Sequence, residues 1–262
     1  MKYAHDLVET LDIELIDRDV FRGWNTVDTR GKATLYGGQV AAQALMAAGR
    51  TVSGDRRPHS LHGYFLRPGD PRRAVLLQVH RDRDGGSFSA RHVSAIQDGE
   101  VIFSMLASFQ RPEAGPMVDL VPTHDMPPPD RCVPRTDLAL LDICAPPADP
   151  ESGGRESVDR MWIRSRSVVP GDPLTQACAL AFVSDLGSGF GRLAVPGLAR
   201  GGPSIDHALW FHEAVDVNEW LVLELWPNKA GGARGVYSGS LRDHRGRLGA
   251  TLVQEMLLRE RP

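Results

Sequence analysis

Residues 202–212, GPSIDHALWFH, place a serine, an aspartate and two histidines close together. These side-chain types suggest a serine hydrolase, in which a histidine removes the proton of the attacking serine. A hydrolase nucleophile usually sits at a strained turn between a strand and a helix, as in GxSxG. Ser204 instead follows Pro203 at the start of an extended segment, and we expect His207 on the opposite face of that strand. The pattern therefore disfavours a serine nucleophile.

The same stretch does not predict a metal site. Asp206 and His212 share a strand face, but at the standard rise they are roughly 20 Å apart. Metal ligands must converge on one point. We therefore expect no metal and no other cofactor, and we expect His207 to form a structural bond to a neighbouring strand. His59 and His62 in PHSLHGYF form a second pair, which leaves a histidine-based hydrolysis open.

Composition excludes several classes of partner. A net charge of −3 over 262 residues gives no sign of a nucleic-acid or acidic-lipid surface. No stretch approaches the roughly 20 apolar residues of a membrane span. The three cysteines form no CxxC pair, so we expect a cytoplasmic protein rather than a disulfide scaffold.

Two helices and two sets of strands must position these residues. The first helix is expected at 36–51, which is rich in alanine. The second is expected at 170–186, with Asp172 as N-cap and Pro173 at its first position. Four strand-like stretches follow each helix: 60–68, 74–84, 87–97 and 100–110, and then 204–212, 219–228, 233–242 and 247–260.

The order of these elements indicates a duplication. Each half closes with a hairpin, around Asp98-Gly99 in the first half and around 243–246 in the second. The stretch between the halves is rich in proline and acids and lacks periodicity, which is typical of a connector. We predict an α+β chain with an N-terminal repeat at 1–110, a Pro-rich connector at 111–158 and a C-terminal repeat at 159–262. Each repeat is an antiparallel sheet wrapped around its helix.

Blocks in both halves carry a family resemblance. They are LYGGQVAAQALMAA, HSLHGYFLRPGD, SIDHALWFH, NEWLVLEL and TLVQE. In sequence and in order they resemble the acyl-CoA thioesterase II (TesB-type) family. The resemblance implies a double hotdog fold and hydrolysis of fatty acyl-CoA, the expected partner, to free fatty acid and CoA. Hotdog sheets often pair further, so a homo-oligomer, a dimer of double hotdogs, is the expected assembly.

The resemblance also implies three site residues. The acid of the family's SD segment corresponds to Asp185, the hydroxyl before the DH pair to Ser204, and the glutamine of VQE to Gln254. Together they would position a water for direct attack on the thioester, with Asp185 as the base. Ser204 and Gln254 can each donate and accept a hydrogen bond, which suits holding a water.

Further residues are candidate substrate contacts. Gly38 at the start of the first helix could turn an amide toward the thioester carbonyl, and His59 could contact substrate. The arginines that could hold the CoA phosphates are Arg67, Arg91 and Arg234. Two other functions stay open: a non-catalytic acyl-CoA binding or sensing protein, and a hotdog enoyl-CoA hydratase. Neither predicted helix contains the histidine that such hydratases usually carry.

Overall fold

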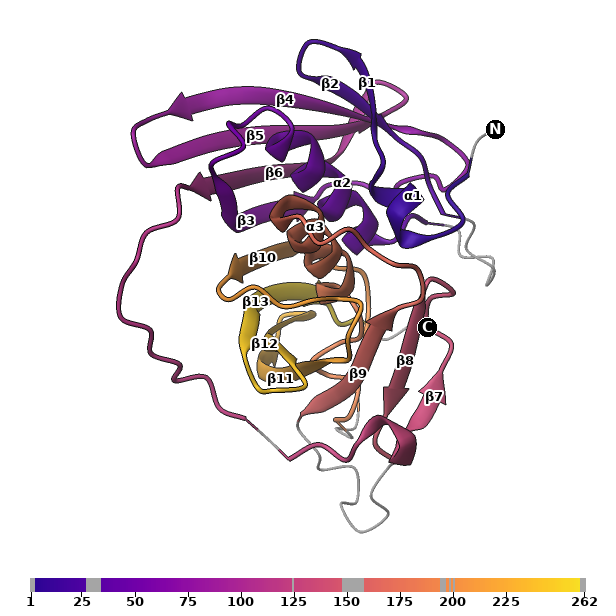
Figure 1. The fold of residues 1–262 in the computed structure, drawn as a ribbon. Coiled ribbons are helices and arrows are strands. Elements are labelled where there is room, and N and C mark those ends of the chain that lie inside the picture. The colour runs from indigo at the N-terminus through magenta and orange to yellow at the C-terminus, as the bar shows by residue number, and fades with distance from the viewer. Residues whose placement is uncertain are drawn as a thin grey trace.

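The computed structural model describes residues 3–26, 34–123, 125–147, 158–193, 197, 199 and 201–259. Within these residues, 13 strands form a single sheet in the order β1-β2-β4-β5-β6-β3-β10-β13-β12-β11-β9-β8-β7 (Figure 1). The first half of the chain supplies α1 (Leu7–Leu11), β1 (Glu14–Asp17), β2 (Val20–Gly23), α2 (Gly37–Gly49), β3 (Arg57–Phe65), β4 (Val75–Asp84), β5 (Phe88–Gln97) and β6 (Glu100–Gln110). The second half supplies η1 (Pro129–Arg131), β7 (Val133–Arg135), β8 (Leu141–Ala145), β9 (Asp159–Ser165), α3 (Pro173–Ser184), β10 (Asp206–Phe211), β11 (Leu221–Gly231), β12 (Arg234–Asp243) and β13 (Leu248–Leu257).

The two halves of the chain fold with the same topology. The first half-sheet has the order β2-β4-β5-β6-β3, and the second has the matching order β9-β11-β12-β13-β10. In each half the helix follows the first of these strands in the chain. β3 and β10 join the half-sheets as antiparallel neighbours, with Leu61 opposite Leu209. The predicted α+β double hotdog is confirmed.

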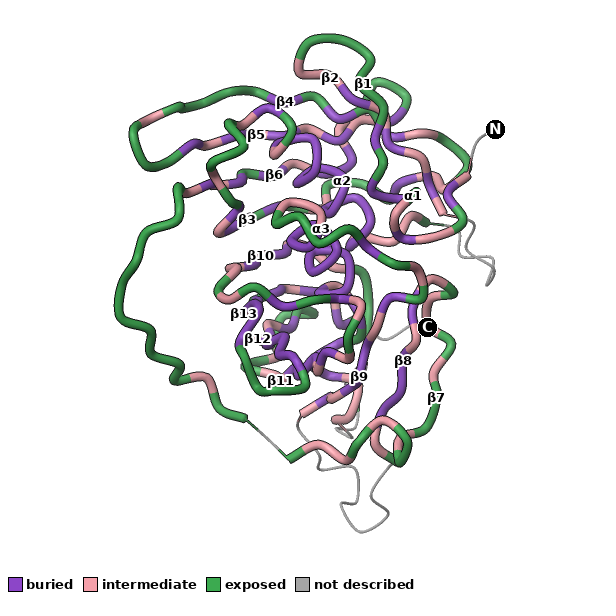
Figure 2. The backbone as a smooth tube through the Cα atoms, viewed as in Figure 1, coloured by how far each residue is buried: buried purple, intermediate pink, exposed green. Residues whose placement is uncertain are grey.

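The small residues of α2 and α3 allow the helices to lie at the centre of the molecule. Every residue of α2 from Gly38 to Ala48 is buried, and so is the stretch of α3 from Gln176 to Ser184 (Figure 2). A Cβ atom on Gly38 would lie 2.4 Å from the carbonyl oxygen of Phe182, so the two backbones approach at a distance that only glycine allows. This close approach holds the start of α2 against the end of α3.

The predicted turns and caps are present. Asp98 and Gly99 have φ angles of 55° and 81°, as a tight hairpin turn between β5 and β6 requires. Asp172 caps α3 by accepting a hydrogen bond from the backbone N–H of Thr175 at 3.0 Å. None of the helices in the described ranges is both long enough and apolar enough to cross a membrane.

The predicted connector contains more regular structure than its composition indicated. η1, β7 and β8 all lie in it, and β8 pairs with β9 across the predicted boundary at 158. β7 and β8 have three and five residues, which is too short for an alternating pattern to stand out. Residues 111–120 are exposed and run along the outside of the molecule from β6 (Figure 2).

Candidate active site

Asp185, Ser204 and Gln254 meet at one point in the structure; we refer to them as the polar cluster. Nε2 of Gln254 donates to Oδ1 of Asp185 at 2.9 Å and to Oγ of Ser204 at 2.5 Å. Oγ of Ser204 in turn donates to Oδ1 of Asp185 at 3.3 Å. The structure therefore brings together the three residues that the family resemblance implies.

Three different elements of the second half position the polar cluster. Asp185 is the C-cap residue of α3, at the point where the buried helix ends. Ser204 precedes β10 and forms an isolated bridge with Met256. Gln254 lies on β13, where alternate side chains including Leu252 and Met256 point into the core. The strand alternation therefore explains why this glutamine is buried.

The expectation that His207 faces away from Ser204 is wrong. β10 begins only at Asp206, whose side chain accepts a hydrogen bond from the backbone N–H of Glu255 at 2.6 Å. Ser204 thus lies in an irregular stretch, where the alternation of a strand does not apply. His207 and Ser204 both approach Gln254, from its two ends.

His207 contacts the far end of the Gln254 amide, and the orientation of that amide indicates which ring nitrogen carries the proton. Its side chain is fully buried, its Nδ1 contacts Oε1 of Gln254, and its Nε2 lies 2.8 Å from Oγ of Ser184. Since Nε2 of Gln254 donates to Asp185, Oε1 must accept, and the proton of this contact belongs to Nδ1 of His207. The same Ser184 hydroxyl also lies 3.0 Å from the carbonyl oxygen of Ala181, to which it can donate. The contact between His207 on β10 and Gln254 on β13 is a bond across strands, as expected for a structural histidine.

A cavity of about 660 Å³ opens beside the polar cluster. Asp185 and Ser204 lie in its wall, together with residues from both halves: Tyr36, Gly37, Val40, Phe65, Arg67, Ile102, Arg135, Leu138 and Leu257. Much of this wall is apolar, and two arginines lie in it. The cavity therefore combines a lining that suits a hydrocarbon chain with cations that suit an anionic group.

The start of α2 also reaches this cavity. A Cβ atom on Gly37 would lie 2.7 Å from Oδ2 of Asp185. The backbone of α2 therefore lies next to the carboxylate with no side chain between them. Tyr36 is the N-cap residue, and its side chain makes no cap hydrogen bond within the described ranges. The first N–H groups of α2 have no partner inside the helix, and the helix dipole makes this end attractive to negative charge.

Tyr36 contributes a neutral hydroxyl to the same region. Its OH donates to the carbonyl oxygen of Phe182 at 2.7 Å. Burial and the negative charge of Asp185 raise the pKa of Tyr36, so its hydroxyl keeps its proton. Tyr36 therefore connects the start of α2 to the end of α3 through an uncharged hydrogen bond.

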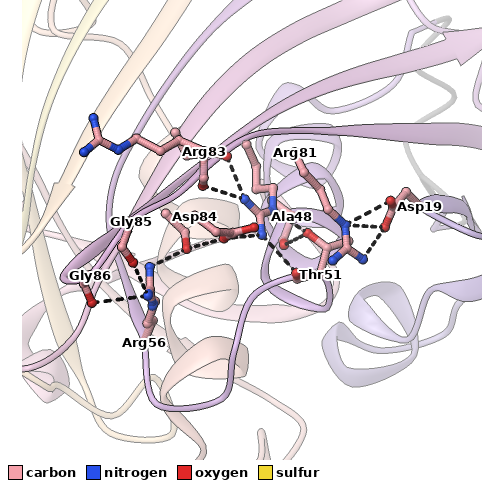
Figure 3. A network of polar contacts seen from close by, with 12 residues as sticks. Asp19, Ala48, Thr51, Arg56, Arg81, Arg83, Asp84, Gly85 and Gly86 are labelled. Atoms are coloured by element: carbon pink, nitrogen blue, oxygen red, sulfur yellow. Dashed lines mark hydrogen bonds and ion pairs between the residues drawn. The ribbon is translucent and has the colours of Figure 1, made fainter.

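The structure excludes Arg91 as a phosphate contact. Its side chain is only 1% exposed. The guanidinium donates to Oγ1 and the carbonyl oxygen of Thr51, to the carbonyl of Arg83 and to the carboxylate of Asp84. Figure 3 shows Thr51, Arg83 and Asp84 in this polar network. Arg91 lies on an inward-facing position of β5 and secures it to the end of α2.

The remaining predicted substrate contacts, Arg67, Arg234 and Gly38, lie in different parts of the structure. Arg67 lines the cavity and pairs with Glu100 at 2.8 Å. Arg234 pairs with Glu255 at 2.8 Å and is not part of the cavity wall. Gly38 makes the backbone contact between α2 and α3 described above. Of these three residues, Arg67 is the one placed to meet a ligand in the cavity.

His59 lies away from the polar cluster. It lines a second cavity of about 510 Å³, near the opposite end of β3 from Phe65. Its Nε2 is 2.8 Å from Oγ of Ser108, and burial lowers the pKa of the imidazole. Within the described part of the chain, no group of three His, Cys, Asp or Glu side chains could hold a metal ion.

The contact between His207 and Gln254 could not be read from the sequence. The sequence shows only that Ser184 and Asp185 are adjacent at the end of the predicted second helix, not which residues they contact. Ser184 contacts His207 and Asp185 contacts Gln254, so neighbouring residues hold the two partners.

Comparison with known proteins identifies the relatives of this chain. Residues 25–110 match the family described as "Acyl-CoA thioesterase N-terminal domain", and residues 117–258 match "Acyl-CoA thioesterase C-terminal domain". Acyl-coenzyme A thioesterase 8 of Homo sapiens is 34% identical over 96% of this chain and 88% of the human protein. Acyl-CoA thioesterase 2 of Haemophilus influenzae is 32% identical over 97% of each chain. The crystal structure of acyl-CoA thioesterase II TesB2 from Mycobacterium marinum is 36% identical, with a TM-score of 0.83 over 98% of this chain and 99% of that one.

Proposed function

This chain belongs to the acyl-CoA thioesterase family, and we propose that it hydrolyses fatty acyl-CoA to free fatty acid and CoA at the polar cluster. The observation that carries the proposal is the hydrogen-bonded arrangement of Asp185, Ser204 and Gln254 beside a cavity of about 660 Å³. The cavity wall contains the carboxylate and the hydroxyl, and the buried amide of Gln254 bonds to both of them. The carboxylate and the hydroxyl can hold a water, and the carboxylate can take its proton.

In the proposed reaction, Asp185 and Ser204 hold a water on the cavity side of the polar cluster. The water oxygen attacks the thioester carbonyl carbon, and its proton passes to the Asp185 carboxylate. The carbonyl oxygen becomes an oxyanion, which the first N–H groups of α2, unpaired within the helix, can stabilise. Collapse breaks the C–S bond, and the sulfur takes the proton from Asp185 to leave as CoA, which restores the carboxylate, while the acyl group leaves as the acid.

Direct attack by water agrees with the contacts of Ser204. Its Oγ interacts with Gln254 and Asp185, whereas His207 contacts the far end of the glutamine amide. In the described ranges, no histidine therefore contacts Ser204 as a base would in a serine hydrolase. Attack by a histidine-activated water has less support, because His59 lines the other cavity.

The cavity wall supports an acyl-CoA substrate. Val40, Phe65 and Leu138 offer apolar surface to an acyl chain. Arg67 and Arg135 can face the CoA phosphates, since guanidinium groups bind phosphate oxygens well.

Two further predictions accompany this function. All three cysteines are free thiols, which supports a cytoplasmic location. The exposed side chains of Tyr64, Leu106 and Val253 lie on central strands of the sheet, which supports pairing of two chains through its outer face. Light scattering of the purified protein tests the dimer.

The decisive experiment is single-turnover hydrolysis of an acyl-CoA panel by the wild type and by Asp185→Asn. The wild type is expected to release CoA thiol from at least one chain length, and the variant to release it far more slowly. Binding of acyl-CoA without thiol release would instead identify a binding protein. Undiminished hydrolysis by the variant would show that the polar cluster is not the site.

A further inference from the structure

Tyr237 is a buried tyrosine whose hydroxyl the proposed reaction does not use. Its side chain is 0% exposed. Its OH makes no hydrogen bond to any of the residues that the structure describes. A buried hydroxyl without a partner is destabilising, and native proteins contain few of them. The position of this hydroxyl therefore needs a physical explanation.

The strand register places Tyr237 beside the polar cluster. Tyr237 on β12 is directly opposite Gln254 on β13. Residues directly opposite in an antiparallel pair share a face of the sheet, with Cβ atoms about 5 Å apart. Gln254 reaches Asp185 from that face, and the side chain of Tyr237 leaves β12 on the same face.

Close packing holds the Tyr237 ring in this position. A Cβ atom on Gly189 would lie 2.3 Å from Cβ of Tyr237, so the backbone at Gly189 lies directly against the side chain. The ring of Phe190 meets the ring of Tyr237 edge-on, with centroids 6.4 Å apart. A ring packed in this way keeps its hydroxyl at one place in the core.

The surrounding charges make the Tyr237 hydroxyl a donor. Burial raises its pKa, and the negative charges of Asp185 and Asp206 raise it further. The hydroxyl therefore keeps its proton and faces a region of negative potential. A single water can join such a donor to a carboxylate that is too far away for a direct hydrogen bond.

We propose that Tyr237 is a positioning residue of this active site, whose hydroxyl donates to a buried water that donates in turn to the Asp185 carboxylate. This role rests on the proposed function, in which Asp185 receives the proton of the attacking water. The bridge approaches Asp185 from the core, behind the wall of the cavity, and so supports the carboxylate in the orientation that the attacking water needs. Tyr237 itself does not touch the substrate.

The first test is Tyr237→Phe, which removes the hydroxyl and keeps the ring. The expected result is a kcat about five- to tenfold lower, corresponding to one lost hydrogen bond in the transition state, with an unchanged KM for acyl-CoA. The melting temperature is expected to stay within a few degrees of the wild type. An unchanged kcat, or a change in KM alone, would overturn the proposal.

Ser240→Ala provides a matched control. Ser240 is on the same strand, is fully buried, and its hydroxyl also lacks a partner in the described part of the chain. It pairs with Thr251 and Glu224 rather than with a member of the polar cluster. Its removal is expected to leave kcat unchanged. An equal loss of kcat in both variants would mean that any buried hydroxyl of β12 has this effect, and would refute a specific role.

A crystal structure of the wild type tests the inference without an activity measurement. It is expected to show a water within about 3.2 Å of both the Tyr237 hydroxyl and an Asp185 carboxylate oxygen. No such water would overturn the proposal. Failure of the wild type to hydrolyse any acyl-CoA would refute the proposed function, whereas an active wild type with an equally active Tyr237→Phe refutes only the role of Tyr237.

Discussion

Nδ1 of His207 faces Oε1 of Gln254 on the buried side of the polar cluster. The glutamine amide can be placed in two orientations that differ by exchange of its oxygen and nitrogen. The reversed orientation would direct Oε1 at Asp185 and would place two acceptors against each other. The Asp185 carboxylate therefore determines which end of Gln254 faces it, and His207, which lies outside the cavity wall, contacts the opposite end of the amide.

Asp185→Asn is expected to reduce kcat/KM by at least about 100-fold, because an amide cannot accept the proton of the attacking water. The substitution preserves shape, so the protein should remain folded. Thiol release from acyl-CoA measures the effect. Asp142→Asn, which alters an ion pair with Arg164 and Arg166 elsewhere, should retain wild-type activity. Equal activity of the two variants would contradict the assignment of Asp185.

His207→Ala is expected to lower both stability and activity. It leaves Oε1 of Gln254 without its buried histidine partner, removes one of the two contacts of Ser184 Oγ and opens a cavity, which together cost about 3 kcal/mol. Urea unfolding measures this free energy. His62→Ala removes a ring contact with Trp210 from an exposed position and should change stability by less than about 1 kcal/mol. A small effect at His207 would show that the amide does not need this support.

Gly37→Ala tests the close approach of α2 to Asp185. The added methyl group would lie 2.7 Å from Oδ2 of Asp185 and 2.8 Å from the ring of Phe65, so one of them must move. Because small displacements of a catalytic group are costly, kcat should fall by about 10- to 100-fold. Gly54→Ala is the matched control, since a Cβ there meets no described atom within 4 Å. Wild-type kcat in Gly37→Ala would mean that the carboxylate tolerates displacement.

Arg91 and Arg67 should affect different properties. Arg91→Ala breaks a buried network around Thr51 and Asp84 and should lower the free energy of unfolding by about 3 kcal/mol. Arg67→Ala should raise KM for acyl-CoA about fivefold and change stability by less than about 1 kcal/mol. Urea unfolding and steady-state kinetics of both variants separate the two effects. A large loss of stability in Arg67→Ala with an unchanged KM would contradict the assignment of Arg67 as a substrate contact.

Asp119 should give the protein part of its sensitivity to acid. Its hydrogen bond with Arg242 lowers the pKa of the carboxyl below its ordinary value. A lowered folded-state pKa contributes stability above the unfolded pKa of about 3.9, and this contribution is lost as pH falls through the folded-state pKa. Asp119→Asn should therefore be less stable than the wild type at pH 7, and the difference should shrink below about pH 4. Urea unfolding at pH 7, 4 and 2.5 measures it. A constant difference would exclude this ion pair as the source.

The large elements of this fold were predictable because their signals are local. Asp172 and Pro173 mark the start of α3, and Asp98-Gly99 marks the turn between β5 and β6. β7 and β8 lacked such a signal, because they are short and lie among prolines and acids. Their pairing depends on β9, which is a tertiary contact rather than a sequence pattern.

The sequence predicts the site only in part. A motif identifies residues by their type and spacing, but it does not show what surrounds them in the fold. Asp185, Ser204 and Gln254 came from the family resemblance and lie together in the structure. Arg91 was misassigned because an arginine on a strand looks the same in sequence whether it faces water or the core. The face on which His207 lies depends on where β10 begins, and the alternation of residues does not reveal that starting point.

The cavity beside Asp185 uses parts of both repeats. The bare start of α2 comes from the first repeat, and all three members of the polar cluster come from the second. Separated halves would therefore each carry an incomplete set of groups. Because the two repeats are parts of one chain, they need not have the same sequence, as the two subunits of a homodimer must. They correspond to the two different subunits of a heterodimer. Each repeat is thus free to accumulate its own substitutions, and one can specialise in chemistry while the other specialises in holding the substrate.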